Sequence, residues 1–168
     1  GFWEIGRSSD NGVSNVAWGL STDVPVRGDF DGDGRLDVAV YRPSNGIWYI
    51  QQSNNSGNLY MYFGTTGDIP MPADMDGDGK DDFVVFRLSD GNWYWMRSVT
   101  GRFTVINFGT QGDIPVNGDF DGDGKADVTV YRPSNGTWYT RRSTDLGVQA
   151  TQFGLGTDIP VAGNYDAD

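Results

Sequence analysis

A segment of 45 residues recurs along the chain, and this period constrains the fold more than any other feature of the sequence. An acidic stretch marks each copy, beginning at Asp29, Asp74, Asp119 and, in an incomplete form, Asn164. Tryptophans keep the same spacing, at Trp3, Trp48, Trp93 and Trp138. A fixed period of this size is typical of repeat architectures. We therefore expect an array of near-identical units rather than one asymmetric domain.

Each repeat is expected to fold into about four short strands. In the repeat over residues 68–112, runs of β-branched and aromatic residues predict strands at 83–87, 93–97 and 103–108, and a short Ile-Pro-Val segment precedes the next acidic stretch. Asn45-Gly46 lies between two such runs, which indicates a hairpin turn. These units predict an all-β fold, a β-propeller built from ~45-residue four-stranded blades with a calcium loop in each blade. A β-solenoid is the alternative, but its rungs are shorter.

The period also divides the chain into blades. We expect one repeat domain over residues 1–168, with a partial blade at 1–22, blades at 23–67, 68–112 and 113–157, and a partial blade at 158–168. A ring closed by these repeats alone would lack one strand and leave sheet edges exposed. The segment is therefore expected to belong to a larger propeller, or to join copies of itself in a homo-oligomeric ring or a filament.

The acidic stretches have the composition of calcium-binding loops. Each of the three complete stretches follows the pattern Asp-x-Asp-x-Asp-Gly-x-x-Asp, which supplies carboxylate oxygens and the glycine that a tight loop around Ca²⁺ requires. Four carboxylates within nine residues repel one another unless a cation lies among them. We assign three complete ligand sets: Asp29, Asp31, Asp33 and Asp37 with the Arg35 carbonyl; Asp74, Asp76, Asp78 and Asp82 with the Lys80 carbonyl; Asp119, Asp121, Asp123 and Asp127 with the Lys125 carbonyl. Asn164, Asp166 and Asp168 supply half of a fourth site.

An EF-hand is excluded by what surrounds these loops. Position twelve of that motif is a glutamate and helices flank it, whereas this chain has Val40, Val85 and Val130 at position twelve and predicted strands on both sides. The loops are thus expected to hold Ca²⁺ within a β-sheet protein.

The net charge of −11 comes mostly from these loops, because 15 of the 23 acidic residues lie in the four acidic stretches. Such a chain is not expected to bind nucleic acid, whose phosphates need clustered Lys and Arg. No apolar run approaches the ~20 residues of a membrane span. Loops of modest affinity fill only where Ca²⁺ is near millimolar, so we expect a secreted or cell-surface protein.

The repeated motifs resemble a known family. The segments DFDGDGxxD and VxVYRPSNGxWY, followed by Phe-Gly and Asp-Ile-Pro, look like the FG-GAP repeat of integrin α-subunit propellers and of bacterial secreted proteins, where it is also called a VCBS-type repeat. The resemblance covers essentially the whole chain. It implies that the metal loop joins the first and second strands of each blade and makes the blade rigid. It says less about function, since one fold supports many activities.

Catalysis is not expected. The sequence contains no His and no Cys, which removes the usual general base, thiol nucleophile and zinc ligands. Glu4 is the only glutamate, beside Trp3 in a predicted strand, and the dense carboxylate pairs all lie in the predicted calcium loops. An active site usually breaks the symmetry of a repeat at one place, and no such place is evident.

Other recurring side chains have structural interpretations with functional alternatives. Each of Trp48, Trp93 and Trp138 precedes a Tyr, so one ring of each pair should face each side of its sheet, with core packing favoured over sugar stacking. Aromatic or Met side chains at loop position two should pack beneath the metal, at Phe30, Met75, Phe120 and Tyr165. Three arginines should pair with neighbouring carboxylates, or else contact acidic ligands, at Arg42, Arg87 and Arg132.

The sequence therefore favours an extracellular, calcium-stabilised module that binds a protein or a glycan in adhesion or recognition. Two alternatives stay open: a structural subunit that assembles with copies of itself, and an accessory domain of a secreted hydrolase.

Overall fold

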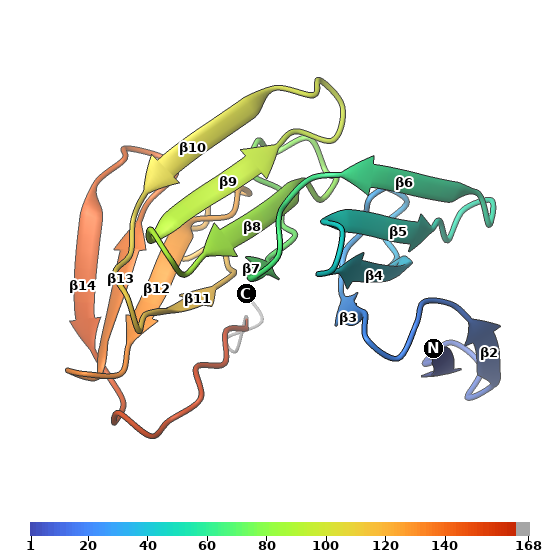
Figure 1. Cartoon of the computed structure of the whole chain (residues 1–168), viewed down its shortest axis with the longest axis horizontal. Helices are drawn as coiled ribbons and strands as arrows, with labels where there is room; N and C mark the ends of the chain where they lie inside the picture. The colour runs from blue at the N-terminus through green and yellow to red at the C-terminus, as the bar shows by residue number, and fades with distance from the viewer. Residues whose placement is uncertain (164–168) are drawn as a thin grey trace. The chain divides into compact units, whose positions relative to one another are not determined.

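The computed structural model describes residues 1–163, which form 14 β-strands divided between two compact units (Figure 1). The first unit comprises residues 1–66, and the second begins at Gly67. Every sheet is antiparallel and follows the order of the chain, so each repeat is a simple meander. The prediction of an all-β chain with four short strands in each complete repeat is confirmed.

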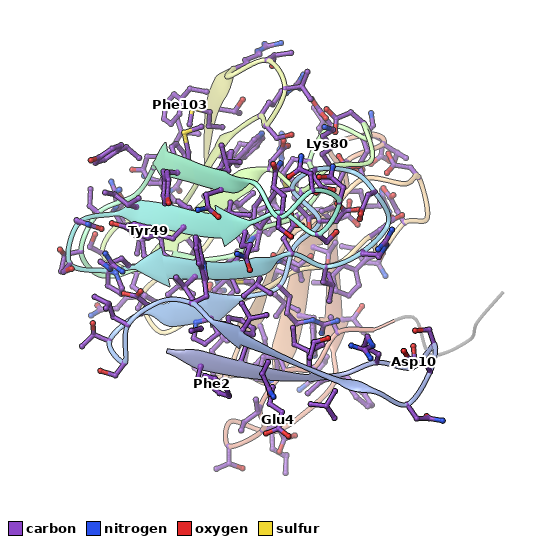
Figure 2. The ribbon with its side chains drawn as sticks, turned by 90° about the vertical axis from the view of Figure 1, so that its right-hand side faces the viewer. Phe2, Glu4, Asp10, Tyr49, Lys80 and Phe103 are labelled. Carbon is purple, nitrogen blue, oxygen red and sulfur yellow. The ribbon has the colours of Figure 1, made fainter. Side chains whose placement is uncertain are left out.

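The first unit contains a hairpin and one four-stranded sheet. The hairpin pairs β1 (Phe2–Gly6) with β2 (Val13–Ala17). The sheet runs β3 (Val24–Val26), β4 (Val38–Arg42), β5 (Ile47–Gln51), β6 (Asn58–Tyr62). Phe2 and Glu4 are exposed on the hairpin (Figure 2). The Trp18 indole N–H donates to the Tyr49 carbonyl oxygen at 3.0 Å and so attaches the hairpin to the sheet.

The second unit contains two such sheets. One runs β7 (Asp68–Pro70), β8 (Phe83–Arg87), β9 (Asn92–Met96), β10 (Phe103–Asn107), and the other runs β11 (Ile114–Val116), β12 (Val128–Arg132), β13 (Thr137–Arg141), β14 (Val148–Gln152). The predicted strand at 83–87 has the observed bounds. The one predicted at 93–97 is shifted by one residue from β9, and the one predicted at 103–108 extends one residue beyond the end of β10. Strand ends fray, so a difference of this size is expected.

The core of the second unit lies between its two sheets. Trp93 and Trp95 project from β9, where they pack with Val128 and Val130 of β12. Tyr94, between the two tryptophans, lies on the opposite face, as the alternation along a strand requires. The predicted division of each Trp-Tyr pair between two faces is therefore confirmed in this sheet, and Trp93 is a core residue that is 1% exposed.

Each tryptophan of the full repeats also binds the Phe-Gly segment that follows β6, β10 or β14. Its indole N–H donates to a phenylalanine carbonyl oxygen at 2.7–3.0 Å, in the pairs Trp48–Phe63, Trp93–Phe108 and Trp138–Phe153. The glycine next to this carbonyl lies against an aromatic ring of the second strand: a Cβ at Gly64 would be 2.6 Å from the Tyr41 hydroxyl oxygen. Close approach of backbone and ring thus requires the glycine of this motif.

The predicted packing at loop position two holds in one repeat and is wrong in another. Phe30 is 4% exposed and meets Trp48 edge to face, with 6.1 Å between ring centroids. Phe120 contacts Trp138 in the same manner but is 45% exposed. Among the described residues, nothing covers the face of the β11–β14 sheet on which Phe120 lies. Met75 is half-buried against the core of the second unit. Tyr165 lies outside the described residues.

Candidate metal centres

Each acidic loop connects the first two strands of its sheet. Residues 29–37 join β3 to β4, residues 74–82 join β7 to β8, and residues 119–127 join β11 to β12; we call them the Asp29, Asp74 and Asp119 loops. One backbone hydrogen bond closes each loop near its ends: Asp37 N–H to Gly28, Asp82 to Ala73 and Asp127 to Gly118, at 2.8–2.9 Å. The strands therefore hold both ends of every loop, as the family resemblance implies.

Glycines allow each loop to curl around its first carboxylate. In the Asp74 loop, Gly77 and Gly79 have φ of 80° and 84°, in the left-handed region that favours glycine. Their N–H groups donate to the two oxygens of the Asp74 carboxylate at 2.6 and 2.8 Å. The same bonds, at 2.6–2.8 Å, hold Asp29 and Asp119 in the other loops. The first carboxylate thus lies fixed in the middle of its loop.

The last carboxylate of each loop is buried below it. Asp82 is fully buried, and its two oxygens accept the N–H groups of Met75 and Ser98 at 3.2 and 2.7 Å. Asp37 and Asp127 make the equivalent pairs of bonds, at 2.7–2.8 Å. Each oxygen retains a lone pair after accepting one hydrogen bond, so these carboxylates can still coordinate a cation.

Three groups of carboxylate oxygens lie close enough together to hold one ion each. Within a group, the oxygens are within 4.8 Å of one another, and the groups are Asp29, Asp31 and Asp33; Asp74, Asp76 and Asp78; Asp119, Asp121 and Asp127. Asp37, Asp82 and Asp123 are predicted ligands that lie outside these groups. The described part of the chain thus brings together three of the four predicted side chains in every complete loop.

The predicted backbone ligands follow directly after the third aspartate. The N–H groups of Arg35, Lys80 and Lys125 donate to the side chain two residues earlier, that of Asp33, Asp78 or Asp123, at 2.9–3.0 Å. The Arg35 guanidinium also approaches Asp33, with Nε 3.6 Å from Oδ2. Asn164, Asp166 and Asp168, the predicted partial site, lie outside the described residues.

The electrostatics of the loops favour a bound cation. Burial, with the nearby charges of Asp76 and Asp78, raises the pKa of Asp82 to about 6. Burial also raises the pKa of Asp37 and of Asp127, and neighbouring loop carboxylates add to both shifts. A positive ion among these groups would lower their pKa values again and so favour the charged form.

Unpaired buried oxygens supply a second indication that an ion fits. Among the described residues, Oδ1 of Asp76 and Oδ1 of Asp121 are buried and accept no hydrogen bond. Buried polar atoms are almost always paired, and these two oxygens point to coordination of an ion as the way in which they are satisfied. The donors are all oxygens, which suits a hard cation such as Ca²⁺ rather than zinc or copper.

A serine near each loop was missed by sequence reasoning. Ser53, Ser98 and Ser143 follow the third strand of their repeats, and each donates its backbone N–H to the last loop carboxylate. The Ser53 hydroxyl also donates to Asp33 at 2.8 Å, whereas Oγ of Ser98 and of Ser143 is buried without a partner in the described structure. Their 45-residue spacing was the signal that could have found them.

Comparison with known protein families agrees with this geometry. The model of the FG-GAP-like repeat matches residues 29–85 and again residues 74–130, so the matches begin at the first aspartates of consecutive loops and together span more than half of the chain. The chain belongs to the FG-GAP-like repeat family. No curated protein and no solved structure matches it. Within residues 1–163, no helix is long and apolar enough to cross a membrane.

Proposed function

We propose that this chain is a calcium-stabilised module of an extracellular β-propeller, with blades at 23–67, 68–112 and 113–157, which binds a protein or a glycan without catalysing a reaction. The observation that carries the proposal is the state of the loop carboxylates. Three carboxylates gather in each complete loop, and the last carboxylate of each loop is buried, which raises its pKa. In the Asp74 and Asp119 loops a buried carboxylate oxygen also accepts no hydrogen bond. Membership of the FG-GAP-like repeat family supports the extracellular setting.

In this proposal the ion has a structural role. The loop residues would hold it between the first and second strands of each sheet, and the ion would reduce the repulsion among their carboxylates. Binding to the folded state alone would stabilise it by about 2.7 kcal/mol per loop at a calcium concentration 100 times the dissociation constant. For a chain of this size that corresponds to roughly 5–10 °C in Tm per filled loop.

The test compares thermal melts with calcium and with EDTA. We expect calcium to raise Tm in the wild-type chain and to have no effect after Asp31, Asp76 and Asp121 are all replaced by Asn. Asp145→Asn is the matched control, because Asp145 is an exposed carboxylate outside the loops, paired with Arg142. It should keep the full calcium response. A wild-type chain that melts at the same temperature in EDTA as in calcium would refute the proposal.

Binding rather than catalysis is supported by the side chains available. The sequence has no His and no Cys, and the described carboxylate clusters that could hold a metal are the loops themselves. The arginines that could have met an acidic ligand are occupied: Arg42, Arg87 and Arg132 each form an ion pair with a buried aspartate. A glycan array and a protein pull-down, both run in calcium, would identify which class of ligand is bound.

Self-assembly is the second candidate, and an open apolar face on the β11–β14 sheet favours it. Trp93 of β9 packs on Val128 and Val130 of the neighbouring sheet. The equivalent Trp138 of β13 instead lines an open cavity of about 310 Å³ with Phe120 and Phe153. A sheet face equivalent to that of β12 from another repeat could cover it. Light scattering in calcium would show a mass above that of one chain, reduced to one chain by Trp138→Ser. A wild-type chain that stays monomeric would exclude this candidate.

A further inference from the structure

A single peptide unit connects the two metal loops of the second unit. The N–H of Ala126 donates to the carbonyl oxygen of Asp74 at 2.7 Å. The other end of this same peptide is the carbonyl of Lys125, a predicted ligand for the ion of the Asp119 loop. Asp74 in turn lies at the centre of its own loop, where its carboxylate accepts the N–H groups of Gly77 and Gly79. One rigid peptide plane thus touches both candidate sites.

Two further contacts hold the loops together. The Asn117 side-chain amide donates to the Pro72 carbonyl oxygen at 2.7 Å, next to the start of both loops. The methylene stem of Lys125 lies over Gly77: a Cβ built on this glycine would be 3.1 Å from Cε of the lysine. The Asp74 and Asp119 loops are therefore packed on each other by a backbone bond, a side-chain bond and an apolar contact.

We propose that the Asp74 and Asp119 loops bind calcium with positive cooperativity, transmitted by the Lys125–Ala126 peptide. The inference rests on the proposed function, because it requires that both loops bind the ion. It goes beyond that function by assigning to the Lys125–Ala126 peptide the positioning of groups in both the Asp74 loop and the Asp119 loop.

Polarisation of the peptide gives the first reason for this coupling. A cation drawn to the Lys125 carbonyl withdraws electrons from the peptide and makes the Ala126 N–H a better donor to Asp74. Hydrogen bonds in series strengthen one another in this way.

Ordering gives the second reason. An ion in one loop restricts the motion of the backbone against which the other loop packs. The second loop then loses less conformational entropy when it binds its own ion, so it binds more tightly. Reciprocity then requires that each ion raises the affinity of the other loop by the same factor.

Repulsion between the two ions acts in the opposite direction. Calcium in one loop removes negative potential that would have attracted calcium to the other. This effect acts partly through solvent, and 0.15 M salt screens it over about 8 Å. The coupling through the peptide is short-range and is hardly affected by salt. The cooperativity is therefore expected to be positive at 0.15 M salt and to weaken at low ionic strength.

The experiment measures calcium affinity at each loop separately in the full chain. Amide NMR signals of Gly77 and Gly122 report the Asp74 and Asp119 loops, and calcium is titrated in 0.15 M KCl. We expect the Asp74 loop to bind calcium about 5- to 150-fold more weakly when the Asp119 loop is silenced by Asp121→Asn with Asp123→Asn. Silencing the Asp74 loop by Asp76→Asn with Asp78→Asn should weaken the Asp119 loop by the same factor.

Two variants test the route. Ala126→Pro removes the N–H donor, so silencing the Asp119 loop should then change the affinity of the Asp74 loop much less than it does in the wild-type chain. Leu36→Pro is the matched control at the equivalent position of the Asp29 loop, which is the only acidic loop of the first unit, and it should leave the coupling in the second unit intact. If Ala126→Pro fails to fold, Asn117→Ala serves as the second test. It removes the hydrogen bond to the Pro72 carbonyl without changing either loop, and it should reduce the factor by which each ion raises the affinity of the other loop.

The outcomes separate the two proposals. Calcium-dependent shifts at both glycines, with affinities that are independent of each other or that rise when the neighbour is silenced, would overturn the cooperativity and leave the proposed function standing. Coupling that survives Ala126→Pro at full strength would overturn the assigned route. The absence of any calcium-dependent shift in the wild-type chain would overturn the proposed function, and the cooperativity with it.

Discussion

Arg87 and Asp68 form a two-point ion pair across strands β8 and β7. The guanidinium Nε and Nη2 donate to the two carboxylate oxygens at 2.7 and 2.9 Å, and the Asp68 side chain is fully buried. The guanidinium also lies over the Tyr94 ring, 4.3 Å from its centroid. The trio recurs as Asp23, Arg42 and Tyr49 and as Asp113, Arg132 and Tyr139. It fixes the short first strand to the second, opposite the acidic loop that connects them.

Loss of this arginine should be costly. Arg87→Leu removes the positive charge that balances the buried Asp68 carboxylate, and we expect the free energy of unfolding to fall by about 3–5 kcal/mol. Arg142→Ala is the matched control because its partner Asp145 is exposed, and it should cost less than about 1 kcal/mol. Urea denaturation at saturating calcium measures both. Replacing Arg87 and Asp68 together by Leu should recover part of the loss, and equal effects of Arg87→Leu and Arg142→Ala would contradict the prediction.

The equivalent pair in the first unit predicts a loss of stability in acid. Hydrogen bonds from Arg42 lower the pKa of the Asp23 carboxyl below its ordinary value of 3.8. Because the folded-state pKa is the lower one, the pair's contribution is complete above the unfolded-state pKa and disappears as the pH falls through the folded-state pKa. The difference in unfolding free energy between wild type and Asp23→Asn, both in EDTA, should be constant between about pH 5 and 7 and shrink below about pH 4. A difference that grows in acid would contradict this assignment.

The repeat period made most of the strands predictable, because the same local pattern could be read several times. Runs such as residues 83–87 combine β-branched and aromatic side chains between turn signals, and this local chemistry suffices to place β8. The loops were equally local, since the four predicted aspartate ligands of each lie within nine residues. Local spacing therefore predicted which side chains gather, as in the group of Asp74, Asp76 and Asp78.

Contacts across the sheet could not be predicted in the same way. The arginines were expected to pair with carboxylates, but the choice of Asp68 for Arg87 depends on the register between β7 and β8. Ser98 reaches Asp82 only because the hairpin of β8 and β9 brings residues 16 apart in sequence together. The exposure of Phe120 depends on what packs against its face of the sheet. The sequence pattern is the same around Phe30 and Phe120, so it cannot predict that one is buried and the other exposed.

Trp93 and Trp138, which occupy equivalent positions in the two sheets of the second unit, should differ in their effect on stability. Trp93 is 1% exposed and packs between the two sheets, so Trp93→Ala should lower the free energy of unfolding by about 3–5 kcal/mol. Trp138 occupies the equivalent position on an open face, and Trp138→Ala should cost clearly less in a monomeric chain. Urea denaturation of dilute protein in calcium gives both values. Equal losses would show that the Trp138 face is covered in solution.

One turn position in each repeat has a left-handed backbone whatever residue occupies it. Asn11, Ser56 and Leu146 have φ of 55°, 57° and 60°, and the equivalent Gly101 has φ of 66°. In the second unit the amides of Gly101 and Leu146 donate to the carbonyl oxygens of Arg97 and Arg142, at 2.9 and 3.1 Å, so the two turns have the same hydrogen bond. The positions therefore form a natural comparison of glycine with a bulky side chain.

Leu146 is strained and gains little from burial, since it is 58% exposed. A left-handed conformation costs a residue other than glycine roughly 1–2 kcal/mol, and the greater freedom of glycine in the unfolded chain offsets about 0.5–1 kcal/mol of that. Leu146→Gly should therefore raise the free energy of unfolding by about 0.5–1 kcal/mol, and Gly101→Leu should lower it by a similar amount. Chemical denaturation of the two variants measures both changes. Effects of the same sign would show that the strain at this turn does not control its stability.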